Sequence, residues 1–328
     1  MKRSHRWLAA TALVLALAAC QTAAPPGTDD GADTTAPEIV SVTPADGANG
    51  VTRSAKIKIQ FSEPMDIVST QAAYASDSDG IKPAQVTFTW EDQGKRLVIT
   101  PNAPLAYSPD ENYKTYTFTL STAATDKAGN PLVEAKTVSF NTLRTLTGQL
   151  QAERIDGAAY YASDASGQSY GASSTGDTAF AGLSDTDAGD YYCDRAFFSF
   201  ALSGLPAGTE EVLAARLGLT ASQVGDPSSF TYYLDHVNFG DTLDGDDYDL
   251  SVYATGEWTF ASFNDGSETA FDVGDWVQTS FAAGDDHFQV RVWMNSCDTA
   301  FRDGYDGYRF NTSESASPPT LAVTYYAP

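Results

Sequence analysis

The chain has 328 residues and carries 43 acidic against 19 basic side chains, which gives a formal net charge of −24 at pH 7. A surface this acidic repels nucleic-acid phosphates and anionic lipid headgroups, because proteins bind both through cationic side chains. We therefore expect no nucleic-acid partner, and the length allows two domains.

Basic side chains and a short apolar stretch open the chain. Lys2, Arg3 and Arg6 precede an apolar stretch at residues 7–19, which ends in small residues directly before Cys20. This order is typical of a secretory signal peptide, and the stretch is shorter than the roughly 20 residues that span a bilayer as a helix. We therefore expect residues 1–19 to direct export.

Small residues followed by a cysteine resemble the lipobox of bacterial lipoproteins. The resemblance implies cleavage before Cys20, lipidation of its sulfur and a membrane anchor; an ordinary signal peptide cut near a cysteine is the alternative. Residues 20–36 carry no large apolar side chain, so we expect a flexible tether. In lipoproteins sorted at the next position, Gln21 implies the outer membrane or the cell surface.

Apolar and polar residues alternate in short runs between residues 37 and 142. Alternation with a period of two places one face of a strand in a core and the other in water, and turns rich in Gly, Asn and Asp separate the runs. The sequence therefore predicts an antiparallel β-sandwich. The expected strands are residues 39–42, 57–61, 86–90, 96–100, 116–120 and 137–140.

The same segment resembles the bacterial Ig-like domain of the S-layer type. The matching motifs are Thr35-Ala36-Pro37, Val42-Thr43-Pro44-Ala45-Asp46-Gly47, Phe61-Ser62-Glu63-Pro64-Met65-Asp66, Leu97-Val98-Ile99-Thr100-Pro101, Asp126-Lys127-Ala128-Gly129-Asn130-Pro131-Leu132 and Phe140-Asn141-Thr142. Such domains are mostly spacers, stalks and adhesive modules without chemistry of their own. The resemblance therefore implies structural roles for Glu63 and Asp66, not a catalytic pair of carboxylates.

Residues 144–328 again show strands, rich in Tyr, Phe and Thr, which suit a pleated surface. The sequence predicts a second β-sandwich, of the jelly-roll kind, so the expected fold class is all-β with two sandwich domains. A short helical turn is expected at residues 273–281, capped by Asp272. The expected strands are residues 196–202, 212–220, 230–239, 288–293 and 321–325.

Over residues 150–326 this second segment resembles the DNRLRE-like sandwich domain, which is related to a family of carbohydrate-binding modules. The resemblance implies glycan binding at a cell surface or beside exported enzymes. Residues 222–229 look like an insertion relative to the family, and Cys193 and Cys297 are not family constants. The matching motifs are residues 198–208, 212–219, 271–277, 308–314 and 318–325.

Two cysteines, Cys193 and Cys297, remain once Cys20 is lipidated. An even pair in an oxidising compartment predicts a disulfide. It would close a loop of about 100 residues and contribute roughly 4–5 kcal/mol by chain-entropy estimates. Two free thiols are the alternative, and two cysteines without nearby histidines make a poor zinc site.

An aspartate-rich run around Gly245 is a candidate calcium site. Oxygen ligands at alternating loop positions suit Ca²⁺, which takes 6–8 oxygens, although the spacing is not that of an EF-hand. Asp185, Asp187 and Asp190 form a second acidic cluster, and solvated acidic loops in a very acidic protein are the alternative for both. The candidate ligands are Asp241, Asp244, Asp246, Asp247 and Asp249.

Enzymatic chemistry finds little support in the sequence. His236 and His287 lie in or beside expected strands, and no nucleophile elbow, H-E-x-x-H or C-x-x-C motif occurs. We expect packing or surface roles for both histidines, and no enzyme.

Tyr305 and Tyr308 lie in a segment rich in Asp and Gly, and exposed aromatic rings are suited to stacking against sugars. We expect both at the surface as candidate ligand-binding residues. The leading hypothesis is a non-enzymatic, lipid-anchored cell-surface protein in which an Ig-like spacer presents a sandwich that binds a polysaccharide or matrix component. The alternative is a structural envelope or adhesion component with calcium-stabilised acidic loops, which contacts other envelope proteins and has no glycan ligand.

Overall fold

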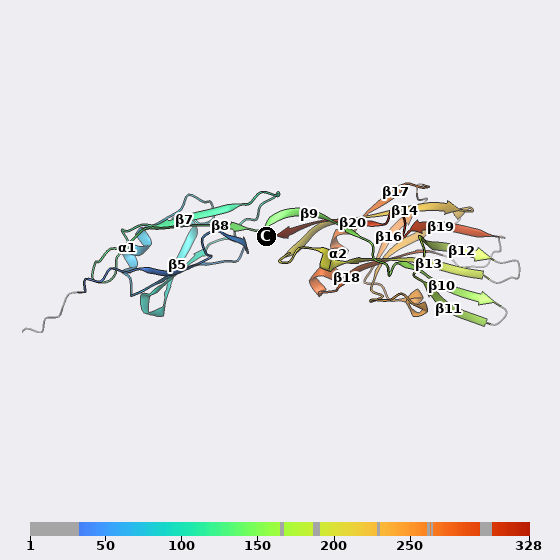
Figure 1. The fold of residues 1–328 in the computed structure, drawn as a ribbon, viewed down its shortest axis with the longest axis horizontal. Helices are drawn as coiled ribbons and strands as arrows, with labels where there is room; N and C mark the ends of the chain where they lie inside the picture. Colours follow the sequence, from blue (N-terminus) through green and yellow to red (C-terminus); the bar gives the residue numbers. More distant parts are fainter. Residues whose placement is uncertain are drawn as a thin grey trace, which may run out of the picture.

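The computed structural model describes residues 33–164, 167–185, 191–227, 230–260, 263, 265–295 and 304–328. This part of the chain is almost entirely β-structure and forms two sandwiches that lie end to end (Figure 1), which confirms the all-β prediction. The first described residues lie at the outer end of the first sandwich, whereas the C-terminus lies at the junction between the two (Figure 1). No helix of this part is long and apolar enough to cross a membrane.

Two four-stranded sheets enclose the core of the N-terminal sandwich, residues 33–142. Their strand orders are β1-β3-β6-β5 and β2-β8-β7-β4. In β3, Ile57, Ile59 and Phe61 are buried while Lys58 is exposed, so the alternation places one face in the core as the sequence predicts. The strands are β1 (Ile39–Thr43), β2 (Ala48–Val51), β3 (Ile57–Phe61), β4 (Tyr74–Ala75), β5 (Val86–Glu91), β6 (Arg96–Pro101), β7 (Thr115–Leu120) and β8 (Lys136–Thr142).

A six-residue helix, α1 (Ile67–Ala72), interrupts the strands of this sandwich. It is too short to produce an apolar period in the sequence, and we did not expect it. The helix begins because the Asp66 carboxylate accepts a hydrogen bond from the Ser69 N–H at 2.8 Å. Asp66 therefore has a structural role.

Twelve strands of the described chain build the C-terminal sandwich, residues 144–327. The hydrogen-bonded path is β16-β15-β18-β13-β12-β19-β14-β20-β9, with β10 and β11 added beside β13 and β17 beside β14. The strands are β9 (Arg144–Gln151), β10 (Gly157–Asp164), β11 (Gly167–Ser173), β12 (Thr178–Asp185), β13 (Tyr191–Ala201), β14 (Glu211–Val224), β15 (Tyr232–Val237), β16 (Ala254–Phe260), β17 (Glu268–Asp272), β18 (His287–Met294), β19 (Tyr305–Asn311) and β20 (Thr320–Ala327).

Two long strands change partners along their length and so fold the sheet onto itself. β13 pairs with β12 at residues 191–194 and with β18 at residues 196–201. β14 pairs with β20 over most of residues 211–218 and with β19 at residues 221–224, so the start of the insertion-like stretch simply continues β14. The ring of Phe198 in β13 then meets that of Phe310 in β19 at 5.8 Å.

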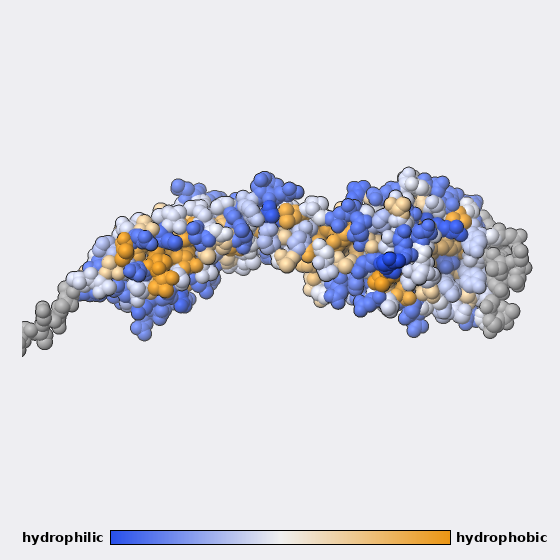
Figure 2. Space-filling model, in the orientation of Figure 1, coloured by the Kyte–Doolittle hydropathy of each residue, from blue (hydrophilic) through white to orange (hydrophobic). Residues whose placement is uncertain are grey.

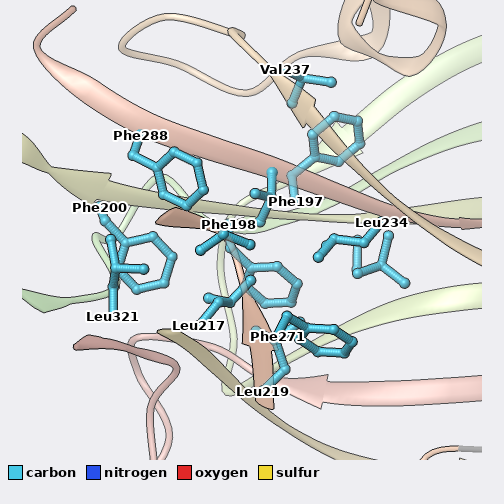
Figure 3. Close-up of a cluster of buried hydrophobic side chains, with 14 of the residues drawn as sticks. Phe197, Phe198, Phe200, Leu217, Leu219, Leu234, Val237, Phe271, Phe288 and Leu321 are labelled. Atoms are coloured by element: carbon cyan, nitrogen blue, oxygen red, sulfur yellow. The ribbon is translucent and has the colours of Figure 1, made fainter. Parts of the chain in front are cut away.

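Phenylalanines and leucines from these strands fill the interior (Figure 3). Phe198, Phe200 and Phe288 from β13 and β18 share this core with Leu217 and Leu321 from β14 and β20, and all five are completely buried. Burying one such side chain contributes about 1.5–3 kcal/mol. The N-terminal sandwich has a separate cluster of buried apolar residues, between residues 51 and 140.

The expected helical turn is present as α2 (Gly274–Ala283), which begins after Val273 and has no side-chain cap. The Asp272 carboxylate accepts a hydrogen bond from the Gly274 N–H at 3.3 Å, so the predicted cap lies one residue before the true one. The helix ends at Gly284, whose φ of 77° is the left-handed conformation that glycine adopts most readily.

Candidate functional site

Side chains from both sandwiches close the junction between them. β8 runs into β9 with only Leu143 between the two strands. The Arg53 guanidinium lies over the ring of Tyr107 at 4.3 Å and over that of Tyr326 at 5.5 Å, and it pairs with the Glu211 carboxylate at 3.2 Å. Arg53 and Tyr107 belong to the N-terminal sandwich, whereas Glu211 and Tyr326 belong to the C-terminal one.

Tyr107 joins these contacts into one network. Its hydroxyl accepts a hydrogen bond from the Arg53 N–H at 3.0 Å and donates one to the Glu210 carboxylate, while its ring meets that of Tyr326 edge-on at 4.9 Å. An exposed cation–π contact or ion pair alone contributes only up to about 1 kcal/mol, so the strength of the network comes from its number of contacts. We call Arg53, Tyr107, Glu210, Glu211 and Tyr326 the Arg53 clasp.

Arg144 and Pro328 make further contacts at the same junction. Arg144 donates hydrogen bonds to the carbonyl oxygen of Glu111 at 2.9 Å and to that of Pro328 at 3.3 Å. The Pro328 ring lies so close to Gly50 and Gly208, one in each sandwich, that a Cβ atom on either glycine would come within 3.0 Å of it. The two sandwiches therefore meet at close range.

A shallow groove crosses the outer face of the C-terminal sandwich. It consists of two adjoining hollows of about 400 and 440 Å³, which share Ala214 and Asp272 as lining residues. Its floor comes from β14, β17 and β20, where the small side chains of Ala214, Ala270 and Ala322 leave the sheet surface low. We call it the β14 groove.

Two charged side chains of opposite sign stand side by side in this groove. Arg216 on β14 lies directly across from Asp272 on β17 and from Ala322 on β20, and both charged residues are exposed. Within the residues that the structure describes, the Arg216 guanidinium has neither a hydrogen bond nor an ion pair, whereas Asp272 accepts one bond from Gly274. Both side chains therefore retain hydrogen-bonding capacity.

Trp276 in the first turn of α2 lines one end of the groove, and a buried histidine lies behind it. The Trp276 ring stacks on His236 at 5.9 Å, and His236 Nε2 lies 2.9 Å from the Ser280 hydroxyl. A base beside a serine hydroxyl is the geometry of an activated nucleophile, but His236 and Ser280 are only 1% and 2% exposed. Burial lowers the pKa of His236 to about 4, so the ring is neutral and packs in the core.

The acidic run around Gly245 forms a self-contained turn. The Asp244 carboxylate accepts a hydrogen bond from the Asp246 N–H at 2.9 Å, and the Asp247 carboxylate accepts one from the Asp244 N–H at 2.7 Å. These bonds are a capping box at the start of the short 3₁₀ helix Gly245–Asp249. Burial raises the pKa of Asp247.

The other two candidate calcium ligands turn to different partners. Asp249 pairs with Arg195 at 3.0 Å, and Asp241 lies 3.1 Å from His287 Nε2. The structure therefore does not bring the five carboxylates of this run together around one point. Of the second acidic cluster, Asp187 and Asp190 lie outside the described residues, and the side chain of Asp185 is not described.

Polar side chains of β18 hold the loop at residues 238–253. Gln289 donates a hydrogen bond to the Gly240 carbonyl at 2.7 Å. Arg291 donates hydrogen bonds to the loop carbonyl oxygens of Tyr248 at 3.1 Å and Leu250 at 3.2 Å. It also pairs with Asp235 of β15 at 2.7 Å, and these two side chains are only 5% and 1% exposed. From the sequence alone, the polar residues of this strand face would indicate contact with water. In the structure the loop covers the face instead.

Tyr308 does not lie at the surface, so that prediction is wrong. The residue is 1% exposed, its ring packs against Tyr232 at 5.1 Å and Phe263 at 4.9 Å, and its hydroxyl accepts a hydrogen bond from the Phe263 N–H at 3.2 Å. Tyr305 is 51% exposed. Successive side chains of a strand point to opposite faces of the sheet. Tyr305 and Tyr308 are three positions apart on β19, so they lie on opposite faces.

Three carboxylates gather in the N-terminal sandwich, where we expected no site. Oxygen atoms of Asp33, Glu63 and Asp126 lie within 4.8 Å of one another. Burial and the two neighbouring carboxylates raise the pKa of Glu63. Both oxygens of the buried Asp126 accept hydrogen bonds from Asn130 at 2.7 Å, so they are satisfied within the protein.

Apolar side chains reach the surface of the N-terminal sandwich, and Figure 2 shows an apolar area there. Val40, Ile67, Val68 and Val133 are between 48% and 76% exposed. Nothing in the structure shows what covers them.

The disulfide and lipidation predictions depend on residues that the structure does not describe. Cys193 is buried on β13 with 1% of its surface exposed, but Cys297 and the lipidation candidate Cys20 lie outside the described residues. The disulfide and the lipid anchor stay predictions.

The groove and the clasp were not among the expected sites. Arg216 has one sequence signal, because it is the one charged residue of the expected strand at residues 212–220. Its neighbour Asp272 is 56 residues away along the chain, and only the strand register brings the two together.

Comparisons with solved structures return low similarity. An L,D-transpeptidase from Mycobacterium smegmatis shares 14% identity over 52% of this chain and 79% of its own, with a TM-score of 0.24. The N-terminal part of the bacterial S-layer protein SbsC shares 17% over 52% of this chain and 42% of its own (TM-score 0.23). A carbohydrate-binding module of the β-sandwich superfamily shares 11% identity over 90% of this chain and 100% of its own, with a TM-score of 0.19. Similarities this low say nothing about function.

A search of curated proteins finds no match. Residues 33–142, which form the N-terminal sandwich, match the bacterial Ig-like domain family. The chain therefore contains a bacterial Ig-like domain at residues 33–142.

Proposed function

We propose that this is a non-enzymatic, lipid-anchored cell-surface protein whose Ig-like domain is a rigid spacer. The spacer holds the C-terminal sandwich away from the membrane, where the sandwich meets a polysaccharide or matrix component. The observation that carries this proposal is the Arg53 clasp, because a spacer transmits position only if its joint to the next domain does not swing.

The arrangement of the chain supports the same reading. The first described residues leave the Ig-like domain at the end opposite the C-terminal sandwich (Figure 1). A lipid on Cys20, followed by a tether at residues 20–36, would place the membrane at that end. Linked domains move relative to each other by default unless their interface is large and hydrophobic. In this proposal the clasp restricts that motion by a different route, through aromatic, ionic and hydrogen-bonded contacts that act together.

The test compares the native chain with Cys20→Ser in cells. We expect the native chain in the membrane fraction, accessible on intact cells to an antibody against residues 144–328, and we expect Cys20→Ser to be released, because it lacks the acylated sulfur. Gln21→Ala is the matched control, since it alters the next residue and keeps the thiol. Full membrane retention of Cys20→Ser, or a native chain free in the medium without acyl groups, would overturn the proposal.

A further inference from the structure

We propose that the β14 groove binds a neutral polysaccharide, with Arg216 and Asp272 as a paired hydrogen-bond donor and acceptor. This inference rests on the proposed function and names the site and the class of ligand. The sequence indicated Asp272 only as a helix cap and did not indicate Arg216 as a site residue, and the aromatic residues that we expected at the surface lie elsewhere.

The form of the groove fits a chain better than a small molecule. Its two hollows, of about 400 and 440 Å³, adjoin each other and are open to solvent, whereas small ligands are usually enclosed over 70–90% of their surface. Ala214, Ala270 and Ala322 keep the floor low over three strands. A polymer can therefore lie across the sheet and continue beyond both ends.

The polar groups of the groove match those of a sugar. A hydroxyl group both donates and accepts hydrogen bonds, and the groove offers a guanidinium directly beside a carboxylate, with Thr324 on the neighbouring strand. Arg216 is notable because the described residues leave its guanidinium without a protein partner. Trp276 adds an aromatic side chain at one end, which is suited to the apolar face of a sugar ring.

Charge selects a neutral ligand over an anionic one. Asp272 and Asp275 both line the groove and outnumber Arg216, the one basic residue of its lining. The whole chain carries a net charge of −24, so a polyanion would be repelled on approach. A neutral polymer meets no such barrier and still finds charged donors and acceptors, which form stronger hydrogen bonds than neutral groups do.

The experiment is affinity electrophoresis of the full chain in gels that contain hydroxyethylcellulose, galactomannan or dextran, with polygalacturonate as the anionic comparison. We expect at least one neutral polymer to retard the native protein, and Arg216→Ala to weaken that binding about tenfold, the effect of losing a charged hydrogen bond. Ala322→Leu fills the floor without removing a polar group, and we expect a similar loss. Arg309→Ala, at another exposed arginine of the same sandwich, should bind as the native chain does.

The outcomes separate the groove from the proposed function. Equal binding by the native chain, Arg216→Ala and Ala322→Leu would overturn the groove as the site but leave a glycan-binding surface protein. Retardation by polygalacturonate alone, or by none of the four polymers, would overturn the neutral-polysaccharide assignment, while the antibody test on intact cells still decides whether the chain is presented at the surface. Thermal melting of each variant shows whether a loss of polymer binding reflects unfolding. We expect Arg216→Ala to melt at the same temperature as the native chain, because Arg216 is exposed.

Discussion

In the Ig-like domain most strands keep one face in the core and the other in water, whereas β15 and β18 of the C-terminal sandwich are buried on both faces. Their second cover is the loop at residues 238–253, whose carbonyl oxygens accept hydrogen bonds from Gln289 and Arg291 of β18. The Ig-like domain therefore depends mainly on apolar packing, while the C-terminal sandwich also depends on buried polar partners.

The largest effect is expected at the buried ion pair. Asp235→Ala leaves the Arg291 guanidinium buried without its carboxylate, which should lower the free energy of unfolding by about 3–5 kcal/mol. The matched control is Glu91→Ala, which breaks the exposed Arg96–Glu91 pair of the Ig-like domain and should cost about 0–1 kcal/mol. Denaturant unfolding measures both, and similar losses in the two variants would contradict the comparison.

A pH dependence is expected from Asp194 on β13. Burial raises the pKa of Asp194 to about 7, above its value of about 3.9 in the unfolded chain. The folded state then binds the proton more tightly, so the stability from this group is fully present below pH 4 and is lost as pH rises through 7. Asp194→Asn does not titrate, so its stability relative to the native protein should rise by roughly 3 kcal/mol between pH 4 and pH 7.

Chemical unfolding of the native chain and Asp194→Asn at several pH values measures this difference. Asp77→Asn, at an exposed position of the Ig-like domain, is the control and should follow the native protein throughout. A constant offset between Asp194→Asn and the native chain would refute the expectation.

A smaller effect separates the two tyrosines of β19. Tyr308→Phe removes the acceptor of the buried Phe263 N–H, and we expect a loss of about 1–2 kcal/mol. Tyr305→Phe alters a half-exposed ring and should stay within about 0.5 kcal/mol of the native protein. Thermal unfolding of the two variants decides, and equal melting temperatures would speak against the buried role of Tyr308.

The sequence predicted the Ig-like domain better than the C-terminal sandwich, because alternation is visible only where one strand face is wet. All six strands expected there are present, extended by no more than two residues at either end, while β2 and β4 are too short to leave a pattern. In the C-terminal sandwich β9 to β12, β16, β17 and β19 were not expected. Several of these, such as Gly167–Ser173, are composed largely of small and polar residues.

The candidate site was harder to predict because its residues meet only through strand register and domain contact. Arg216, Asp272 and Ala322 come from three strands, and no short motif joins them. In the Arg53 clasp, likewise, Arg53 contacts Glu211 and Tyr326, which are more than 150 residues away along the chain. The Asp244 run was visible as a motif, but its carboxylates serve their own turn.

The most direct test of the rigid spacer is the distribution of distances between two spin labels, one in each sandwich. The labels are attached at Lys58→Cys in the Ig-like domain and Gln168→Cys in the C-terminal sandwich, which are both exposed positions. The labelled chain also carries Cys20→Ser. We expect a single narrow distribution that broadens when Arg53→Ala opens the clasp and stays narrow in the control Arg96→Ala. A broad distribution in the protein with an intact clasp, unchanged by Arg53→Ala, would contradict the account.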